Sequence, residues 1–385
     1  MSKFNYRLLS YIIGLLLLFN SAAILITSFV SLLLKDGFFN NIIYASLCCF
    51  VIGSIIMFFS RNPTKVINRR DGYLIVIFGW LTMVFSGTLP YIFTDTINNI
   101  PDLIFETMSG YTTTGSSIIS DIESLPQSII FWRSMTHWLG GMGIIVLAIA
   151  ILPLLGIGGM QLFSAEAPGS GISGDKIHPR ISNTAKRLWF IYIGLTLAET
   201  LLLNFAGMSL FDAINHSMSN IATGGFSTKN DSLSHWNSIP LIQYIIVFFM
   251  ILAGTNFLLI YLSIIGKFKK LIYNTEFIWF IVLISFFVII TTIILNTNID
   301  LNSTNFDHPQ VYGKLEASFR HALFQVVAVM TTTGFVTGDF AGWSPFLTML
   351  FFGLMFFGAS SGSTSGGIKI SRHLILIKNG FLEFK

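Results

Sequence analysis

The chain has 385 residues, of which 53% are hydrophobic and only 10% charged, with a formal net charge of +4. Soluble globular proteins carry about 25% charged residues, so the composition excludes that class and indicates a protein solvated mainly by lipid. The two cysteines, Cys48 and Cys49, are neighbours in an apolar stretch and imply no disulfide framework.

Eight apolar stretches are long enough to cross a membrane, because a transmembrane helix needs about 20 residues. They lie near 8–34, 39–60, 73–93, 127–155, 187–207, 240–266, 276–296 and 345–370. The first is too long, and too closely followed by the second, to be a cleaved signal peptide. The pattern predicts an all-α polytopic membrane protein.

Basic residues gather in alternate connections between these stretches. If the N-terminus is cytoplasmic, every basic cluster falls on the cytoplasmic side, as the positive-inside rule requires. The clusters are Lys3 and Arg7; Arg61, Lys65, Arg69 and Arg70; Lys176, Arg180, Lys186 and Arg187; Lys267, Lys269 and Lys270; and Lys369, Arg372 and Lys378. The positive charge therefore reports orientation in a bilayer, and nucleic acid is not an expected partner.

Three polar turns rich in threonine and glycine recur between the later stretches. We call them the first turn (Thr112–Ser116), the second turn (Ala222–Phe226) and the third turn (Thr331–Phe335). Their glycines, Gly115, Gly225 and Gly334, are separated by 110 and 109 residues. All three turns lie on the outer side, and a spacing this even in so apolar a chain is typical of a repeated membrane unit.

Each turn has the same neighbours along the chain. A short, half-apolar segment precedes it, and a proline-started span follows at Pro126, Pro240 or Pro345. The preceding segments are 102–109, 211–219 and 315–328, too short and too polar to span, so they read as pore helices. The predicted organisation is a two-helix extension (1–70), repeat 1 with a cytoplasmic loop (71–185), repeat 2 (186–272) and repeat 3 (273–385).

The turns have the chemistry of a cation filter. Backbone carbonyls can ligate a dehydrated cation without a full negative charge, and glycine tolerates the backbone angles that aim them at one axis. The pore helix would also direct its partly negative C-terminus at the ion. A single Thr/Gly cluster could be an ordinary loop, but three in register favour a filter. The candidate ligands are Thr113, Thr114, Gly115, Thr223, Gly224, Gly225, Thr332, Thr333 and Gly334.

Several ionisable residues lie at membrane depth and need partners. Glu106, His216 and Gln325 fall in register on the three pore helices. We expect Glu106 to pair with Arg133 or to hold the first turn from behind, as filter support. Glu199 is left open between an ion pair, a protonated carboxyl and an interfacial position, and Glu316 with Arg320, at i and i+4, is expected to be a helix-surface pair.

The last span contains a run of glycine and serine that a helix does not easily continue through. Non-helical backbone at membrane depth must be buried or line a watery cavity, so the run is a candidate gating loop. A close helix–helix contact through small residues is the alternative. The Gly-x-Ser-x-Gly match lacks a preceding strand, and the phosphate-loop match lacks the correct lysine spacing, so no enzyme is expected. The candidate gating residues are Gly358, Ser360, Ser361, Gly362, Ser363, Thr364, Gly366, Gly367 and Lys369.

Several long motifs resemble the membrane subunit of Trk-type potassium uptake systems over the whole chain. They are residues 109–116, 132–134, 137–143, 158–163, 166–169, 220–228, 362–364 and 366–369. The resemblance implies four repeats around one pseudo-fourfold pore, potassium as the transported ion, filter segments at the three turns, and a gating loop in repeat 3. It also implies a homodimer, a cytosolic nucleotide-binding regulatory subunit, and location in the bacterial inner membrane.

The chain contains three repeats where the resembling family has four. We therefore expect the sequence to be a fragment or a truncated product that needs another chain to close its pore. The predicted function is potassium uptake, passive or coupled to another ion, with no covalently bound cofactor. The alternative is a non-transporting membrane subunit that assembles with or regulates a complete transporter.

Overall fold

The protein is built from helices that fall into two units, Met1–Trp189 and Phe190–Lys385. The computed structural model describes residues 5–61, 69–141, 143, 180–298 and 309–383. Within these residues the secondary structure is helical apart from turns and one isolated bridge between Phe357 and Ile368. The all-α class predicted from the sequence is confirmed. The C-terminal part of the predicted fourth span and the motifs at 158–163 and 166–169 lie outside the described residues.

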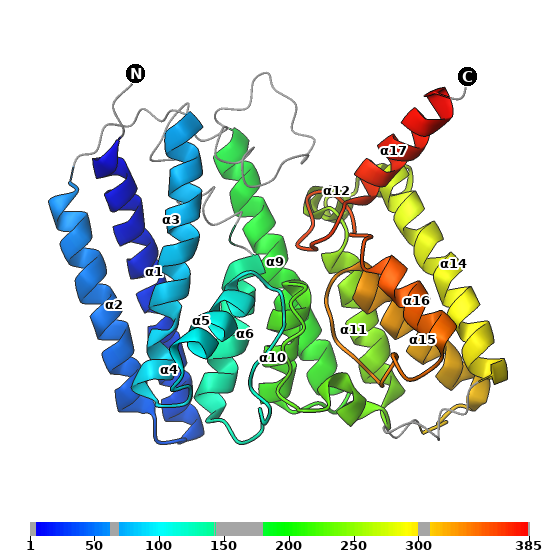
Figure 1. Cartoon of the computed structure of the whole chain (residues 1–385), viewed down its shortest axis with the longest axis horizontal. Coiled ribbons are helices and arrows are strands. Elements are labelled where there is room, and N and C mark those ends of the chain that lie inside the picture. Colours follow the sequence, from blue (N-terminus) through cyan, green and yellow to red (C-terminus); the bar gives the residue numbers. More distant parts are fainter. Residues whose placement is uncertain (1–4, 62–68, 142, 144–179, 299–308, 384–385) are drawn as a thin grey trace. The chain divides into compact units, whose positions relative to one another are not determined.

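In the first unit a short helix lies against two of the longer helices (Figure 1). Its helices are α1 (Tyr6–Leu34), α2 (Phe39–Phe59), α3 (Arg69–Gly87), α4 (Leu89–Phe93), α5 (Ile100–Tyr111) and α6 (Gln127–Gly141). α1 packs against α2, α3 and α6, and α5 packs against α3 and α6. Gly14 and Gly53 allow α1 and α2 to approach closely, because a Cβ on Gly14 would lie 3.0 Å from the carbonyl oxygen of Gly53.

Asp36 connects the two-helix extension to the first repeat. Its Oδ2 accepts a hydrogen bond from the backbone amide of Ser128 at 2.9 Å, at the start of α6. Its Oδ1 accepts from the hydroxyl of Ser31 and, at 3.2 Å, from the amide of Phe38. Partial burial raises the pKa of the Asp36 carboxyl, but these hydrogen bonds outweigh it and hold the pKa below its ordinary value.

Replacing Asp36 with asparagine should therefore lower stability at neutral pH and flatten its dependence on acid. A lowered folded-state pKa stabilises the protein above the unfolded value, and that contribution disappears as pH falls through the folded value. We expect a loss of about 1 kcal/mol at pH 7, because the carboxylate is partly exposed and screened. Thermal unfolding in detergent between pH 7 and 3 measures it. An equal acid-induced loss in the parent protein and the variant would contradict this role.

The second unit contains the elements that the sequence assigns to the predicted repeats 2 and 3. They are α10 (Leu210–Ile221), η2 (Ser232–Trp236), α11 (Pro240–Ala253), α12 (Phe257–Ile264), α13 (Lys269–Ile272), α14 (Thr275–Asn298), α15 (Lys314–Met330), α16 (Pro345–Leu354) and α17 (Ile370–Glu383), while α9 (Arg180–Phe205) crosses the boundary between the units. The buried pore helix α15 packs against α11, α14 and α16 (Figure 1). Its apolar residues form part of a continuous core with those of α11 and α14.

The spans differ in part from the eight apolar stretches predicted from the sequence. Among the described residues, five helices are long and apolar enough to cross a membrane, and the pair α11 and α12 is bent by 105°. The bend has a local cause, since Asn256 caps α12 by accepting a hydrogen bond from the amide of Leu258 at 2.8 Å. α16 has only 10 residues before the chain leaves the helix.

Candidate functional site: three filter turns and a loop

The three pore helices α5, α10 and α15 end with the same backbone conformation. After each helix, one threonine adopts a left-handed conformation, with φ of 52° at Thr113, 55° at Thr223 and 57° at Thr332. The amide of the following residue then bonds to the carbonyl five residues earlier. These bonds join Thr114 to Ser109 at 3.0 Å, Gly224 to Ser219 at 2.9 Å and Thr333 to Ala328 at 2.9 Å.

This is a Schellman helix end, in which the left-handed position is usually glycine. Here it is occupied by threonine, whose β-branched side chain makes positive φ costly. Strained backbone of this kind persists only where the surroundings enforce it, and it concentrates at functional sites. The same costly backbone conformation occurs at the same register position in all three turns, which makes the turns candidates for a functional site.

Two residues later, the glycine of each turn is again left-handed. Its φ is 75° at Gly115, 82° at Gly225 and 81° at Gly334, as expected from the sequence. A Cβ on Gly225 would lie 2.2 Å from the carbonyl oxygen of Thr333, so the second and third turns are in backbone contact. Around Gly334, by contrast, the space within 4 Å of a built Cβ is open.

The first and third turns share a hydroxyl arrangement that the second lacks. The hydroxyls of Thr112 and Thr114 lie 2.8 Å apart, and those of Thr331 and Thr333 have the same separation. Thr112 and Thr331 also donate to the pore-helix carbonyls four residues earlier, each at 2.7 Å. The second turn has Ala222 and Gly224 at the corresponding positions, so it offers fewer side-chain oxygens.

A buried ion pair lies behind the first turn. The Nε of Arg133 donates to Oε1 of Glu106 at 2.9 Å, with 1% and 0% of the two side chains exposed. Glu106 also accepts from the hydroxyl of Ser117 at 3.0 Å and, through Oε2, from the amide of Ile118 at 3.0 Å. Both contacts that the sequence suggested for Glu106 are therefore present: the arginine, and the backbone just beyond the turn.

In the other two repeats, a histidine of the preceding helix contacts a hydroxyl just beyond the turn, at or near the corresponding position. His216, in register with Glu106, places Nε2 2.9 Å from the hydroxyl of Ser227, which is in register with Ser117. In the third repeat the contact moves one helical turn earlier, where His321 Nδ1 lies 2.9 Å from the hydroxyl of Thr337. No local sequence pattern indicates this last pair.

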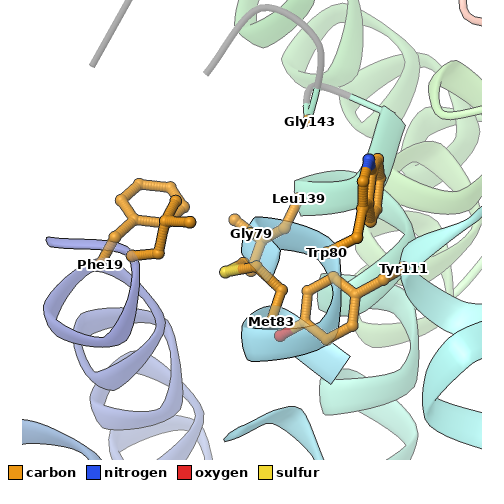
Figure 2. A pocket seen from close by; sticks show the side chains of 9 residues that line it. Phe19, Gly79, Trp80, Met83, Tyr111, Leu139 and Gly143 are labelled. Carbon is orange, nitrogen blue, oxygen red and sulfur yellow. The ribbon is translucent and has the colours of Figure 1, made fainter. Parts of the chain in front are cut away.

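Tyr111, the last residue of α5, fixes the first turn against the surrounding helices. Its hydroxyl donates to Oδ1 of Asn20 on α1 at 2.6 Å. A Cβ on Gly140 would lie 1.9 Å from the carbonyl oxygen of Tyr111, so glycine is required where α6 passes the end of α5. Beside its ring is a small apolar cavity of about 30 Å³, with Trp80, Met83 and Tyr111 on one side and Phe19 on the other (Figure 2).

The predicted break in the last span is a loop, which we call the Gly/Ser loop (358–369). α16 ends at Leu354 and α17 begins at Ile370, so the chain between them is non-helical. The base of the loop is closed by the bridge between Phe357 and Ile368, with a 2.8 Å hydrogen bond from the amide of Gly358 to the carbonyl of Ile368. The alternative, a close helix–helix contact through these small residues, is therefore wrong, because the segment that carries them is not helical.

The Gly/Ser loop contacts the end of α10 and the third turn, both in the second unit. Thr364 donates its hydroxyl to the carbonyl of Ile221, the last residue of α10, at 3.0 Å. The amide of Gly366 donates to the hydroxyl of Thr332 in the third turn at 2.7 Å. These contacts, which no sequence pattern indicated, connect the candidate gate directly with the third turn and with the helix that leads into the second turn.

Arg320 and Glu199 are also buried. Arg320 is only 1% exposed and donates to Glu316 at 2.9 Å and to the amide oxygen of Gln243 on α11 at 2.5 Å. The predicted i, i+4 ion pair is present, but its expected position on the helix surface is wrong for Arg320, because α11 covers this face of α15. Glu199 is fully buried and accepts a 2.5 Å hydrogen bond from the side chain of Asn220, three residues before the left-handed Thr223.

Comparisons with known proteins agree with this architecture. The family model TrkH, described as a cation transport protein, matches residues 39–385. The Trk system potassium uptake protein TrkH of Salmonella typhimurium is 40% identical over 383 residues, covering 99% of this chain and 77% of that protein. TrkG of Escherichia coli K12 is 35% identical, covering 98% and 76%. The crystal structure of the potassium transporter TrkH from Vibrio parahaemolyticus superposes with a TM-score of 0.84 at 36% identity, covering 98% of this chain and 76% of that one.

Proposed function

The chain belongs to the TrkH family of cation transport proteins, which are membrane transporters and not enzymes, and we propose that it transports potassium through the three turns as filter segments. The Gly/Ser loop is the gate in this proposal. Potassium is the ion because the relatives that match nearly the whole chain are potassium uptake proteins. The residues that act as filter, support and gate are those identified from the sequence.

The observation that carries the filter assignment is the repeated backbone conformation. Each turn places a threonine and then a glycine in the left-handed region at the same register, after a pore helix of the same kind. Alternating backbone of this type turns successive carbonyls away from helical hydrogen bonding and leaves them available to a cation. Packing would not by itself produce the same strained pattern three times.

The surroundings of the turns suit a cation. The C-terminal end of each pore helix carries a partial negative charge, and the three helices α5, α10 and α15 all end at their turns. An inside-negative potential supplies about 2.3 kcal/mol per charge per 100 mV, which is enough to drive uptake without a second ion. The ion ligands are neutral carbonyl and hydroxyl oxygens, so bound potassium can also leave.

The cellular setting follows from the basic clusters and from the relatives. We propose a bacterial inner-membrane protein with a cytoplasmic N-terminus, since this orientation places the clusters inside. A homodimer served by a cytosolic nucleotide-binding subunit is the proposed assembly, because the relatives are components of Trk systems.

Ion flux into proteoliposomes tests the function directly. The gene product that carries this sequence is reconstituted, and potassium or rubidium entry is driven by an inside-negative potential. We expect entry that potassium supports at least tenfold better than sodium. Flux no higher than in empty vesicles would contradict the proposal and favour a non-transporting subunit. Equal fluxes for both ions would contradict potassium selectivity.

A further inference from the structure

Glu276, the second residue of α14, binds the Gly/Ser loop through a single oxygen. Its Oε1 accepts hydrogen bonds from the amide of Ser361 at 2.7 Å, from the hydroxyl of Ser361 at 3.1 Å and from the amide of Ser371 at 3.3 Å. Ser361 lies inside the loop and Ser371 lies in the first turn of α17. One carboxylate of α14 therefore binds both the Gly/Ser loop and the start of the helix that follows it.

Glu276 binds Ser361 and Ser371, and the segment between these two residues contacts α10 and the third turn. Between Ser361 and Ser371 lie Thr364 and Gly366, which bond to Ile221 and to Thr332. Asn256, at the bend between α11 and α12, donates to the carbonyl of Ser361 at 2.7 Å. Ser361 is therefore bound by residues of two different helical segments, Glu276 and Asn256. The loop is thus attached to α14 on one side and to the end of α10 and the third turn on the other.

The charge of Glu276 suits this contact. Hydrogen bonds from backbone amides to a carboxylate are stronger than those between neutral groups. The positive charge of Lys369 at the end of the loop is close enough to Glu276 to attract it. Three donors on one oxygen make the loop conformation depend on this residue more than on any single hydroxyl within the loop.

We propose that Glu276 is a positioning residue that latches the Gly/Ser loop in the conformation that contacts the end of α10 and the third turn. This inference rests on the proposed gating function of the loop. While the latch is closed, the loop stays against the third turn and opposes ion passage. Release of Ser361 and Ser371 lets the loop leave the third turn and α10, and conduction rises.

Two measurements on Glu276→Ala, made with the gene product that carries this sequence, test the latch. Hydrogen–deuterium exchange reports on the loop itself, and we expect amides of residues 358–371 to exchange at least tenfold faster while those of α15 are unchanged. Basal rubidium flux into proteoliposomes, without any regulatory protein, should rise at least threefold. Glu276→Gln keeps an acceptor oxygen without the charge and should fall between the parent protein and the alanine variant in both measurements.

Glu383→Ala is the matched control, because it removes an exposed carboxylate of α17 and should change neither measurement. Unchanged loop exchange in Glu276→Ala would overturn the latch. Faster exchange with unchanged or lower flux would overturn the assignment of the latched loop as the closed gate. If the alanine variant does not fold, parent-like exchange and flux in Glu276→Gln overturn the role of the charge. If the parent protein carries no ions, the proposed function fails while the exchange result still decides the latch.

Discussion

Gly225→Ala is expected to abolish potassium uptake, whereas Gly334→Ala should leave a reduced but measurable rate. Both glycines have left-handed backbone, which costs an alanine about 1–2 kcal/mol. Only at Gly225 would the added Cβ also lie 2.2 Å from a carbonyl oxygen, that of Thr333 in the neighbouring turn. Relief of that overlap must displace a candidate ion ligand, while the site around Gly334 has room.

Rubidium uptake by a potassium-uptake-deficient bacterium, normalised to the amount of protein in the membrane, compares the two variants. We expect Gly225→Ala to fall to the background and Gly334→Ala to keep roughly a tenth or more of the parent rate, with a small loss of thermal stability. Gly353→Ala is the control, since this residue of α16 has ordinary φ and open space around it, and alanine there should be neutral or stabilising. Parent-like uptake and selectivity in Gly225→Ala would show that the second turn is not a filter segment.

The repeated architecture could be predicted from the sequence because it depends on local signals. Apolar length, the proline at the start of each following span and the glycine in each turn all act within a few residues. The break after α16 was equally local, since four glycines and four serines between Gly358 and Gly367 oppose a helix. The bend after α11 was not predicted, because Gly254 and the capping Asn256 are two short signals in an otherwise apolar stretch.

The threonines of the turns show where local preference fails. Nothing in the preferences of Thr113, Thr223 or Thr332 indicates a left-handed backbone, and β-branching argues against it. Tertiary contacts impose that conformation: the second and third turns touch each other, and the Gly/Ser loop bonds to Thr332. Contacts of this kind join residues more than 30 positions apart, so a one-dimensional pattern does not contain them.

Arg320 illustrates the same limit for charges. The i, i+4 spacing from Glu316 is the same whether the pair is exposed or buried. Whether the pair is exposed depends on which neighbour covers that face of the helix, and here the neighbour is Gln243 of α11, 77 residues away. The ion pair between Glu106 and Arg133 is easier to predict, because the sequence places both residues at membrane depth, where an unpaired charge costs much free energy.

Removal of the Glu106 carboxylate is the second change with a large expected effect. Glu106→Ala leaves the guanidinium of Arg133 buried without its partner, and breaking a buried pair in this way costs about 3–5 kcal/mol. The variant should unfold at a much lower temperature in detergent and reach the membrane in small amounts. Glu383→Ala, which removes an exposed carboxylate, should leave the melting temperature unchanged.

A double variant separates the stability of the pair from its role at the first turn. Replacing both charges by methionine in Glu106→Met/Arg133→Met removes the unpaired ion, and such apolar replacements are often neutral or stabilising. Most of the stability should therefore return. The hydroxyl of Ser117 and the amide of Ile118 nevertheless lose their acceptor, so the backbone beyond Gly115 is no longer held. We expect a well-folded protein whose preference for potassium over sodium falls at least fivefold; parent-like selectivity in the double variant would reduce the ion pair to packing alone.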